Sequence, residues 1–180
     1  MNRSFPQARA WLAGAACAVI LAACGGGASS QPAGGGTPAS GSLITALETS
    51  GTVPTLGRST SLTGPDANGD GVRDDIAQWI AQQPATTDQK SALLQLASAL
   101  QQALLVDLND QAALLAVSAR EHAAVKCVVR RHVKSVVGDA VRVLERMTAN
   151  TRERAHAYLQ YANAMNGSVS QSPEGDGCAN

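Results

Sequence analysis

An aspartate-rich stretch carries the side chains of this sequence best suited to bind a metal ion. Asp66, Asn68 and Asp70 place oxygen atoms at alternate positions, and Asp74 follows four residues later. Gly71 permits a sharp turn. Ca²⁺ is a hard ion that takes about six to eight oxygen ligands. The spacing therefore predicts a calcium-binding loop, with ligands from Asp66, Asn68, Asp70, Val72 (through its backbone carbonyl), Asp74 and Asp75.

The predicted loop resembles the first nine positions of an EF-hand calcium loop. It departs at the twelfth position, where Ala77 replaces the bidentate glutamate. A closer resemblance is to the calcium loops of extracellular bacterial solute-binding proteins, whose last acidic ligand occupies the place of Asp75. That resemblance implies a structural calcium site rather than a sensor. The alternative is a plain turn, with Asp74 and Asp75 favouring the start of the next helix.

The N-terminus has the three zones of an export signal. Arg3 and Arg9 precede an apolar run over 11–22, and the sequence Leu-Ala-Ala-Cys follows at 21–24. This tetrapeptide resembles the lipobox of bacterial lipoproteins. The resemblance implies that residues 1–23 are a signal peptide and that Cys24 receives a diacylglycerol and an amide-linked acyl chain such as palmitate. The alternatives are a transmembrane anchor and a soluble secretory signal. The run is short for a hydrocarbon core of about 30 Å, and no Ala-x-Ala cleavage site is better placed.

The expected location follows from the same resemblance. In Gram-negative lipoproteins an aspartate after the lipidated cysteine directs retention at the inner membrane, whereas this chain has Gly25. The resemblance therefore implies an envelope lipoprotein, lipid-anchored at the periplasmic face of the outer membrane, although the choice of leaflet stays open. Two further stretches, the aspartate loop and residues 150–161, resemble uncharacterised proteobacterial lipoproteins and bring no activity with them.

The remaining chain divides by composition. Residues 24–42 combine the cysteine with a Gly/Ser-rich segment that cannot bury a core, so a flexible tether is expected. Residues 43–73 contain scattered apolar residues and Pro54, which favour an extended strap over 43–63 and then the aspartate loop. A helical domain over 74–166 and a C-terminal tail over 167–180 complete the chain.

The helical domain is rich in alanine and leucine, which favour helix. Apolar periodicity and capping residues predict helices over 74–83, 88–106, 109–137 and 139–165. Short connections make neighbouring helices antiparallel, so the expected fold is all-α, an up-down bundle of about four helices. The last helix could instead break at Thr151, where a capping sequence occurs.

The cysteine count predicts a disulfide. Once Cys17 leaves with the signal and Cys24 is lipidated, only Cys127 and Cys178 remain, in an oxidising compartment. The tail after Asn166 is long enough to return to Cys127 if the last two helices are antiparallel. The alternatives are free thiols or a dimer linked through Cys178.

Charge and motifs narrow the function. Without Arg3 and Arg9 the chain has 12 basic and 14 acidic residues, which gives no reason to expect a nucleic-acid partner. A nucleophile elbow and a phosphate-binding loop are absent from the sequence, and the three histidines suit core or surface positions better than a metal site. The basic residues Lys126, Arg130 and Lys134 could contact an anionic glycolipid or an acidic envelope protein, though such stripes are usually solvated faces.

The expected function is therefore a non-catalytic, membrane-anchored interaction or structural module of the cell envelope, stabilised by Ca²⁺ and a disulfide. The alternative is an envelope assembly factor or chaperone that binds its clients in a groove between helices.

Overall fold

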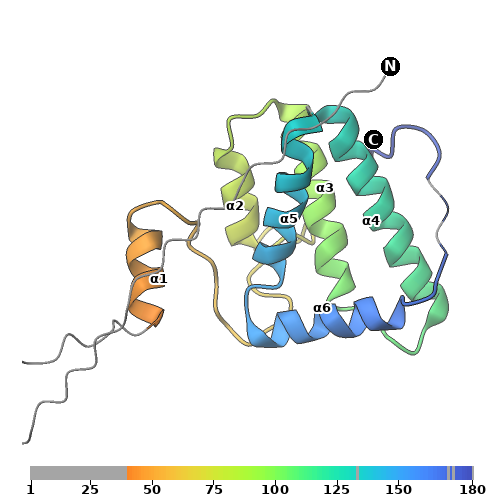
Figure 1. Ribbon diagram of the computed structural model, residues 1–180, viewed down its shortest axis with the longest axis horizontal. Coiled ribbons are helices and arrows are strands. Elements are labelled where there is room, and N and C mark those ends of the chain that lie inside the picture. The colour runs from red at the N-terminus through yellow and green to blue at the C-terminus, as the bar shows by residue number, and fades with distance from the viewer. Residues whose placement is uncertain (1–39, 133, 170, 172, 180) are drawn as a thin grey trace, which may run out of the picture. The chain divides into compact units, whose positions relative to one another are not determined.

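The computed structural model describes residues 40–132, 134–169, 171 and 173–179 (Figure 1). The predicted signal peptide, Cys24 and nearly all of the predicted tether lie outside these residues and stay predictions. Every regular element of the described residues is a helix, which confirms the all-α class. The helices are α1 (Ser40–Thr49), α2 (Asp74–Gln82), α3 (Thr87–Ala103), α4 (Gln111–Arg131), α5 (Lys134–Thr148) and α6 (Arg152–Ala164).

The first three helices of the domain begin close to their predicted positions. Helix α2 has Asp74 and Asp75 in its first turn, where carboxylates favour a helix, and it ends before Pro84. Helix α3 begins at a capping box in which the Thr86 hydroxyl accepts from the amide of Gln89, so Asp88 lies in the first turn and is not the cap. Asp110 caps α4, and its side chain accepts from the amide of Ala113.

The prediction of four helices is not confirmed, because both long predicted helices are divided. Helix α4 ends at Arg131, and the next helix runs through Gly138 instead of stopping there. His132 is extended at the break, and its ring donates to the carbonyl oxygen of Gln89 (3.2 Å). The Gln89 side chain in turn donates to the carbonyl of Arg131 (2.9 Å). The contacts with the start of α3 therefore give the carbonyl at the C-terminal end of α4 a hydrogen-bond donor.

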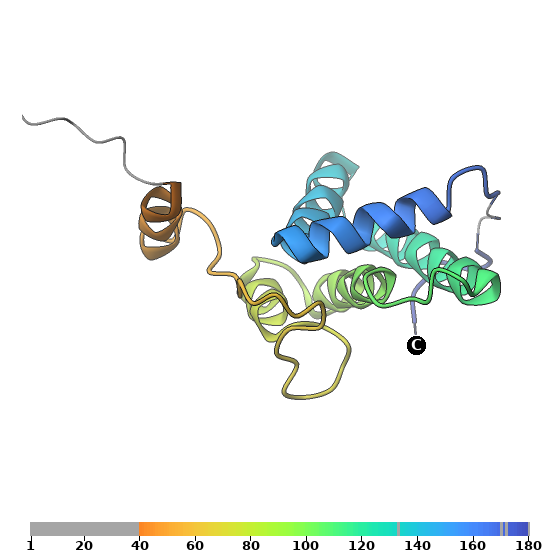
Figure 2. The same cartoon turned by 90° about the horizontal axis from the view of Figure 1, so that it is seen from below.

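The last predicted helix breaks at the alternative position. Thr151 is the N-cap of α6, and its hydroxyl accepts from the amide of Arg154 (3.3 Å). Helix α6 therefore turns away from α5 and runs across the ends of α3 and α4 (Figures 1 and 2). Its Tyr161 packs with Ala103 of α3 and Leu114 of α4.

The predicted extended strap over 43–63 is wrong in its first part, because α1 covers Ser40–Thr49. The helix is supported by local hydrogen bonds, including those from the hydroxyl of Thr45 to Gly41 and of Thr49 to Thr45. The apolar residues of α1 do not face a core, because Leu43, Ile44 and Leu47 are exposed. The sequence therefore contains only a weak pattern by which this helix could be predicted. After Val53 the chain is non-helical up to α2, as predicted.

Helix α3 is the centre of the core. It packs against α2, α4, α5 and α6. Its alanines, including Ala92 and Ala97, are almost fully buried and let neighbouring helices approach closely. The main cluster joins side chains from four helices and the aspartate loop: Val72, Ile76, Ile80, Leu93, Leu96, Leu100, Ala124, Cys127, Val128, Leu144 and Met147. None of the helices in the described residues is long and apolar enough to cross a membrane.

Candidate functional site

Asp66 organises the aspartate loop through backbone hydrogen bonds. Its carboxylate accepts from the amides of Gly69 (2.9 Å), Asp70 (3.2 Å) and Gly71 (2.9 Å). Gly69 and Gly71 both have positive φ, a conformation that glycine adopts without strain. The Asn68 side-chain amide donates to the carboxylate of Asp70 (2.8 Å). The turn therefore gathers the first three predicted ligands, Asp66, Asn68 and Asp70.

The later predicted ligands divide into two groups. Asp74 is joined to the loop, because its carboxylate accepts from the amide of Ala67 (3.0 Å). The side chain of Val72 is buried in the core, which fixes the backbone where its carbonyl was expected to serve. Asp75 is engaged elsewhere: Arg73 donates to both of its oxygens (2.9 Å each), and the amide of Gly57 donates as well (2.7 Å).

The loop meets part of the requirement for calcium. Its donors are carboxylate and amide oxygens, which suit Ca²⁺. In the part of the chain that the structure describes, however, no three His, Cys, Asp or Glu side chains come together closely enough to hold a metal ion. The candidate calcium ligands that share this turn are therefore Asp66, Asn68, Asp70 and Asp74. Asp75 instead forms hydrogen bonds with Arg73 and Gly57 that hold the fold together.

Two buried arginines hold the loop to the junction of α5 and α6, and we call them the arginine clamp: Arg73 and Arg154. Besides Asp75, Arg73 donates to the carbonyls of Met147 (3.2 Å) and Thr148 (3.3 Å) at the end of α5. Arg73 is 1% exposed. The loop is thus attached to α5 by Arg73, which lies at its eighth position, between the predicted ligands Val72 and Asp74.

Arg154 holds the segment that precedes the loop. It is 0% exposed and donates to the carbonyls of Ser61 (3.0 Å) and Gly57 (2.9 Å). Asn150 joins the two arginines, because its side-chain oxygen accepts from Arg73 (3.1 Å) and Arg154 (2.8 Å). Burial and, second, the charge of Arg73 lower the pKa of Arg154.

The arginines leave room for nothing larger than glycine at position 64. Gly64 has a φ of 64°, and a Cβ there would lie 2.6 Å from Cδ of Arg73. The sequence prediction missed the clamp, because no spacing distinguishes Arg73 or Arg154 from surface arginines. The one available signal was the Asn-Thr-Arg-Glu capping sequence beginning at Asn150, which places a polar junction in the chain.

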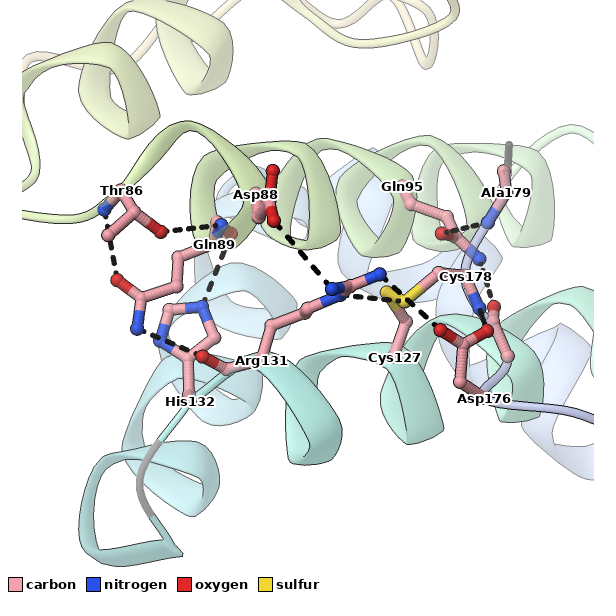
Figure 3. Close-up of a disulfide and its surroundings, with 11 residues drawn as sticks. Thr86, Asp88, Gln89, Gln95, Cys127, Arg131, His132, Asp176, Cys178 and Ala179 are labelled. Atoms are coloured by element: carbon pink, nitrogen blue, oxygen red, sulfur yellow. Dashed lines mark hydrogen bonds and ion pairs between the residues drawn. A yellow bond between two sulfur atoms is a disulfide. The ribbon is translucent and has the colours of Figure 1, made fainter.

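The structure contains the disulfide that the cysteine count predicts, between Cys127 of α4 and Cys178 of the tail (Figure 3). The tail also forms polar contacts on both sides of it. The Gln95 side chain donates to the carbonyl of Gly177 (2.7 Å) and accepts from the amide of Ala179 (2.9 Å). Arg131 forms ion pairs with Asp88 (3.7 Å) and Asp176 (3.4 Å).

The tail also changes the interpretation of the basic residues. Lys126 donates to the carbonyl of Pro173 (2.6 Å), and Arg131 binds Asp176 and Sγ of Cys178 (3.4 Å). The predicted stripe Lys126, Arg130 and Lys134 is interrupted, since Lys134 begins a new helix after the extended His132. In the described residues, Lys126 and Arg131 therefore bind the tail of the protein itself and not an external anion.

A further polar contact joins α4 and α6. The hydroxyl of Tyr161 donates to the carboxylate of Glu121 (2.7 Å), and burial raises the pKa of that carboxyl group. Burial also raises the pKa of Tyr158 to about 12. Tyr161 is 5% exposed, so it belongs to the core. Its hydroxyl needs a buried partner, and Glu121 supplies it.

Comparison with known proteins finds no protein family, no curated protein and no solved structure that matches this chain.

Proposed function

We propose that this chain is a non-catalytic lipoprotein of the cell envelope, anchored through lipid on Cys24 and held rigid by its disulfide. The Cys127–Cys178 bond is the observation that supports this most. Structural disulfides persist in oxidising compartments outside the cytoplasm. Cys127 is 2% exposed inside the core, which is typical of a structural bond and not of a reactive one.

The anchor is proposed from the lipobox-like residues 21–24, and Gly25 favours the periplasmic face of the outer membrane. The proposed partners are the membrane, through the lipid, and an envelope protein or anionic glycolipid; nucleic acid is not proposed. Arg130, an exposed residue of the basic stripe, supports an anionic partner. The described side chains support a packing role, since the buried arginines and the disulfide all join segments of the fold.

Lipidation is tested by metabolic labelling. In cells given labelled palmitate, the wild-type chain is expected to take up label and to be shortened, whereas Cys24→Ala is expected to stay unlabelled and full length. Cys17→Ala is the matched control, because it removes a cysteine from the same apolar run outside the lipobox. Labelling of Cys24→Ala at the wild-type level would contradict the anchor.

We also propose that Ca²⁺ binds the aspartate loop, with Asp66, Asn68, Asp70, Asp74 and the Val72 carbonyl as ligands. The bound ion would neutralise the negative charges of the loop, because several carboxylates lie on one turn and repel each other when no ion is present. The Asp66 hydrogen bonds support this, since they shape the turn before any ion arrives. Rigidity of this kind lowers the cost of binding.

Calcium is expected to raise the melting temperature of the chelator-treated protein. A ligand at about a hundredfold excess over its Kd adds about 2.7 kcal/mol. In a Trp11→Phe background Trp79, on the helix that follows the loop, is the only tryptophan, so its emission reports locally. Mg²⁺ is expected to do less, because it prefers a smaller octahedral shell.

Two variants separate a calcium site from a capped turn. Asp70→Ala is expected to abolish both calcium responses, whereas Asp139→Ala, an exposed aspartate on α5, keeps them. Asp75→Asn is expected to lower basal stability through its lost Arg73 contact and still to respond to calcium. A melting temperature that does not change at millimolar calcium would refute the site.

The second candidate function is an envelope assembly factor or chaperone. A cavity of about 470 Å³ favours it, lined by residues of α3, α4 and the aspartate loop that are both apolar (Leu94, Ala99 and Ala123) and polar (Gln95, Ser98, Gln102 and Arg120). Ala179 of the tail borders the same cavity. A hydrophobic dye that binds the native protein and is released by a client would support this function; absence of dye binding would refute it.

A further inference from the structure

A second cavity lies between the outer face of α2 and the segment that follows α1. Its volume is about 420 Å³, within the usual range of about 300–1,000 Å³ for small-molecule sites. Neither the calcium proposal nor the lipid anchor uses it. The residues important for its chemistry are Glu48, Thr52, Asp75, Gln78, Trp79 and Gln82.

Helix α2 presents two different faces. Ile76 and Ile80 are each 1% exposed and anchor the helix in the core. Gln78 and Gln82, one turn apart, lie on the cavity side with Trp79 between them in sequence. Trp79 packs partly against the core cluster and leaves the rest of its ring to the cavity wall. The cavity therefore has one fixed aromatic wall.

The charged groups of the cavity are already neutralised within the protein. Glu48 forms an ion pair with Arg58 (2.6 Å), whose hydrogen bond lowers the pKa of Glu48. Asp75 forms an ion pair with Arg73 (2.9 Å). Each carboxylate thus has its own arginine, so the cavity offers no unpaired charge to a cationic or anionic ligand, and a neutral ligand is favoured.

Three side-chain amides line the cavity, and that of Gln83 donates to the carbonyl of Trp79 (2.9 Å). The side chains of Gln78 and Gln82 form no hydrogen bond with any residue that the structure describes. Each amide both donates and accepts. A ligand that fits must therefore offer several neutral groups that also donate and accept, beside an apolar surface for Trp79.

We propose that this cavity is a binding site for a neutral carbohydrate. A sugar ring has hydroxyl groups around its edge, which can pair with the amides of Gln78 and Gln82 and with the hydroxyl of Thr52. Its axial C–H bonds form an apolar face that can pack on the Trp79 ring. The proposal goes beyond the proposed envelope role and does not depend on lipidation or calcium.

Binding is tested on the full chain in detergent, with Trp11→Phe so that Trp79 is the only tryptophan. The probes are glucose, galactose, N-acetylglucosamine, lactose, cellobiose and diacetylchitobiose. Each is titrated to about 50 mM, so that a site with a Kd in the millimolar range, or about −4 kcal/mol of binding free energy, is brought close to saturation. At least one probe is expected to give a saturable change in Trp79 emission and a signal in saturation-transfer NMR.

The variants place the site. Gln78→Ala and Gln82→Ala are each expected to weaken binding about tenfold without lowering the melting temperature, because both side chains are exposed and unpaired in the described structure. Gln160→Ala, an exposed glutamine on α6, is the matched control and keeps wild-type affinity. Glucuronate and glucosamine are expected to bind more weakly than their neutral counterparts.

Three results would overturn the proposal. The first is the absence of any NMR or fluorescence response to the six neutral probes. The second is binding that both Gln78→Ala and Gln82→Ala leave unchanged, which would place the sugar elsewhere. The third is tighter binding of glucuronate or glucosamine, which would mean that the cavity selects charge.

Discussion

Removal of the Cys127–Cys178 disulfide is expected to lower the free energy of unfolding by about 4 kcal/mol. The bond joins residues 51 positions apart, and the chain-entropy relation for such a loop gives this magnitude. The tail should then leave α3 and α4, because few contacts besides the disulfide hold it: those of Gln95, Lys126 and Arg131. Chemical denaturation of the Cys127→Ala/Cys178→Ala double variant measures the loss.

Peptide mapping supplies the control. Under non-reducing conditions the wild-type protein should yield a single linked pair containing Cys127 and Cys178 from one chain. A monomer in which both thiols react with an alkylating reagent after denaturation without reductant would contradict the structure. So would a double variant as stable as the wild type, since the closed loop would then contribute nothing to the fold.

Replacement of Arg154 by methionine is expected to cost about 3 kcal/mol. The carbonyl of Ser61 would lose the only donor that the described residues give it, and the carbonyl of Gly57 and the side-chain oxygen of Asn150 would each lose one of two donors. A hydrogen bond to a charged group contributes about 1.5–3 kcal/mol. Relief of repulsion from Arg73 offsets part of this loss. For a domain of this size the melting temperature should fall by about 10 °C.

Arg152→Met is the matched control for that prediction. Arg152 lies on the same helix but is exposed, so its replacement should change stability by less than about 0.5 kcal/mol. Equal melting temperatures of the two variants would show that the arginine clamp adds no stability. A second readout is proteolysis of the segment from Gly57 to Gly64, which should accelerate only in Arg154→Met.

Local patterns predicted the starts of α2, α3 and α4 to within two residues. Asp74, Asp75 and Pro84 bound α2, and Asp110 stands immediately before α4, because capping and proline effects operate within a few residues. The cysteine pair followed from counting and from the length of the tail. A helix start depends on the few residues around it, and the cysteine pair depends on the total number of thiols. Both can therefore be predicted from the sequence.

Long-range contacts decided what the sequence could not. Helix α4 ends where Gln89, 42 residues earlier, binds the carbonyl of Arg131. The break before α6 is fixed by Asn150, whose side-chain amide also donates to the carbonyl of Gly57, 93 residues away (3.0 Å). The predicted ligand Asp75 accepts from the amide of Gly57, 18 residues earlier (2.7 Å). No periodicity in the sequence encodes such partners.

Intact-mass spectrometry of the chain purified from membranes, without reductant, tests the lipid anchor and the disulfide together. We expect one species that begins at Cys24 and carries a diacylglyceryl group and an amide-linked acyl chain. Its mass should also be lower by two hydrogens, for the bond between Cys127 and Cys178. A chain that still begins at Met1, or one that begins at Cys24 without lipid, would refute the lipid anchor.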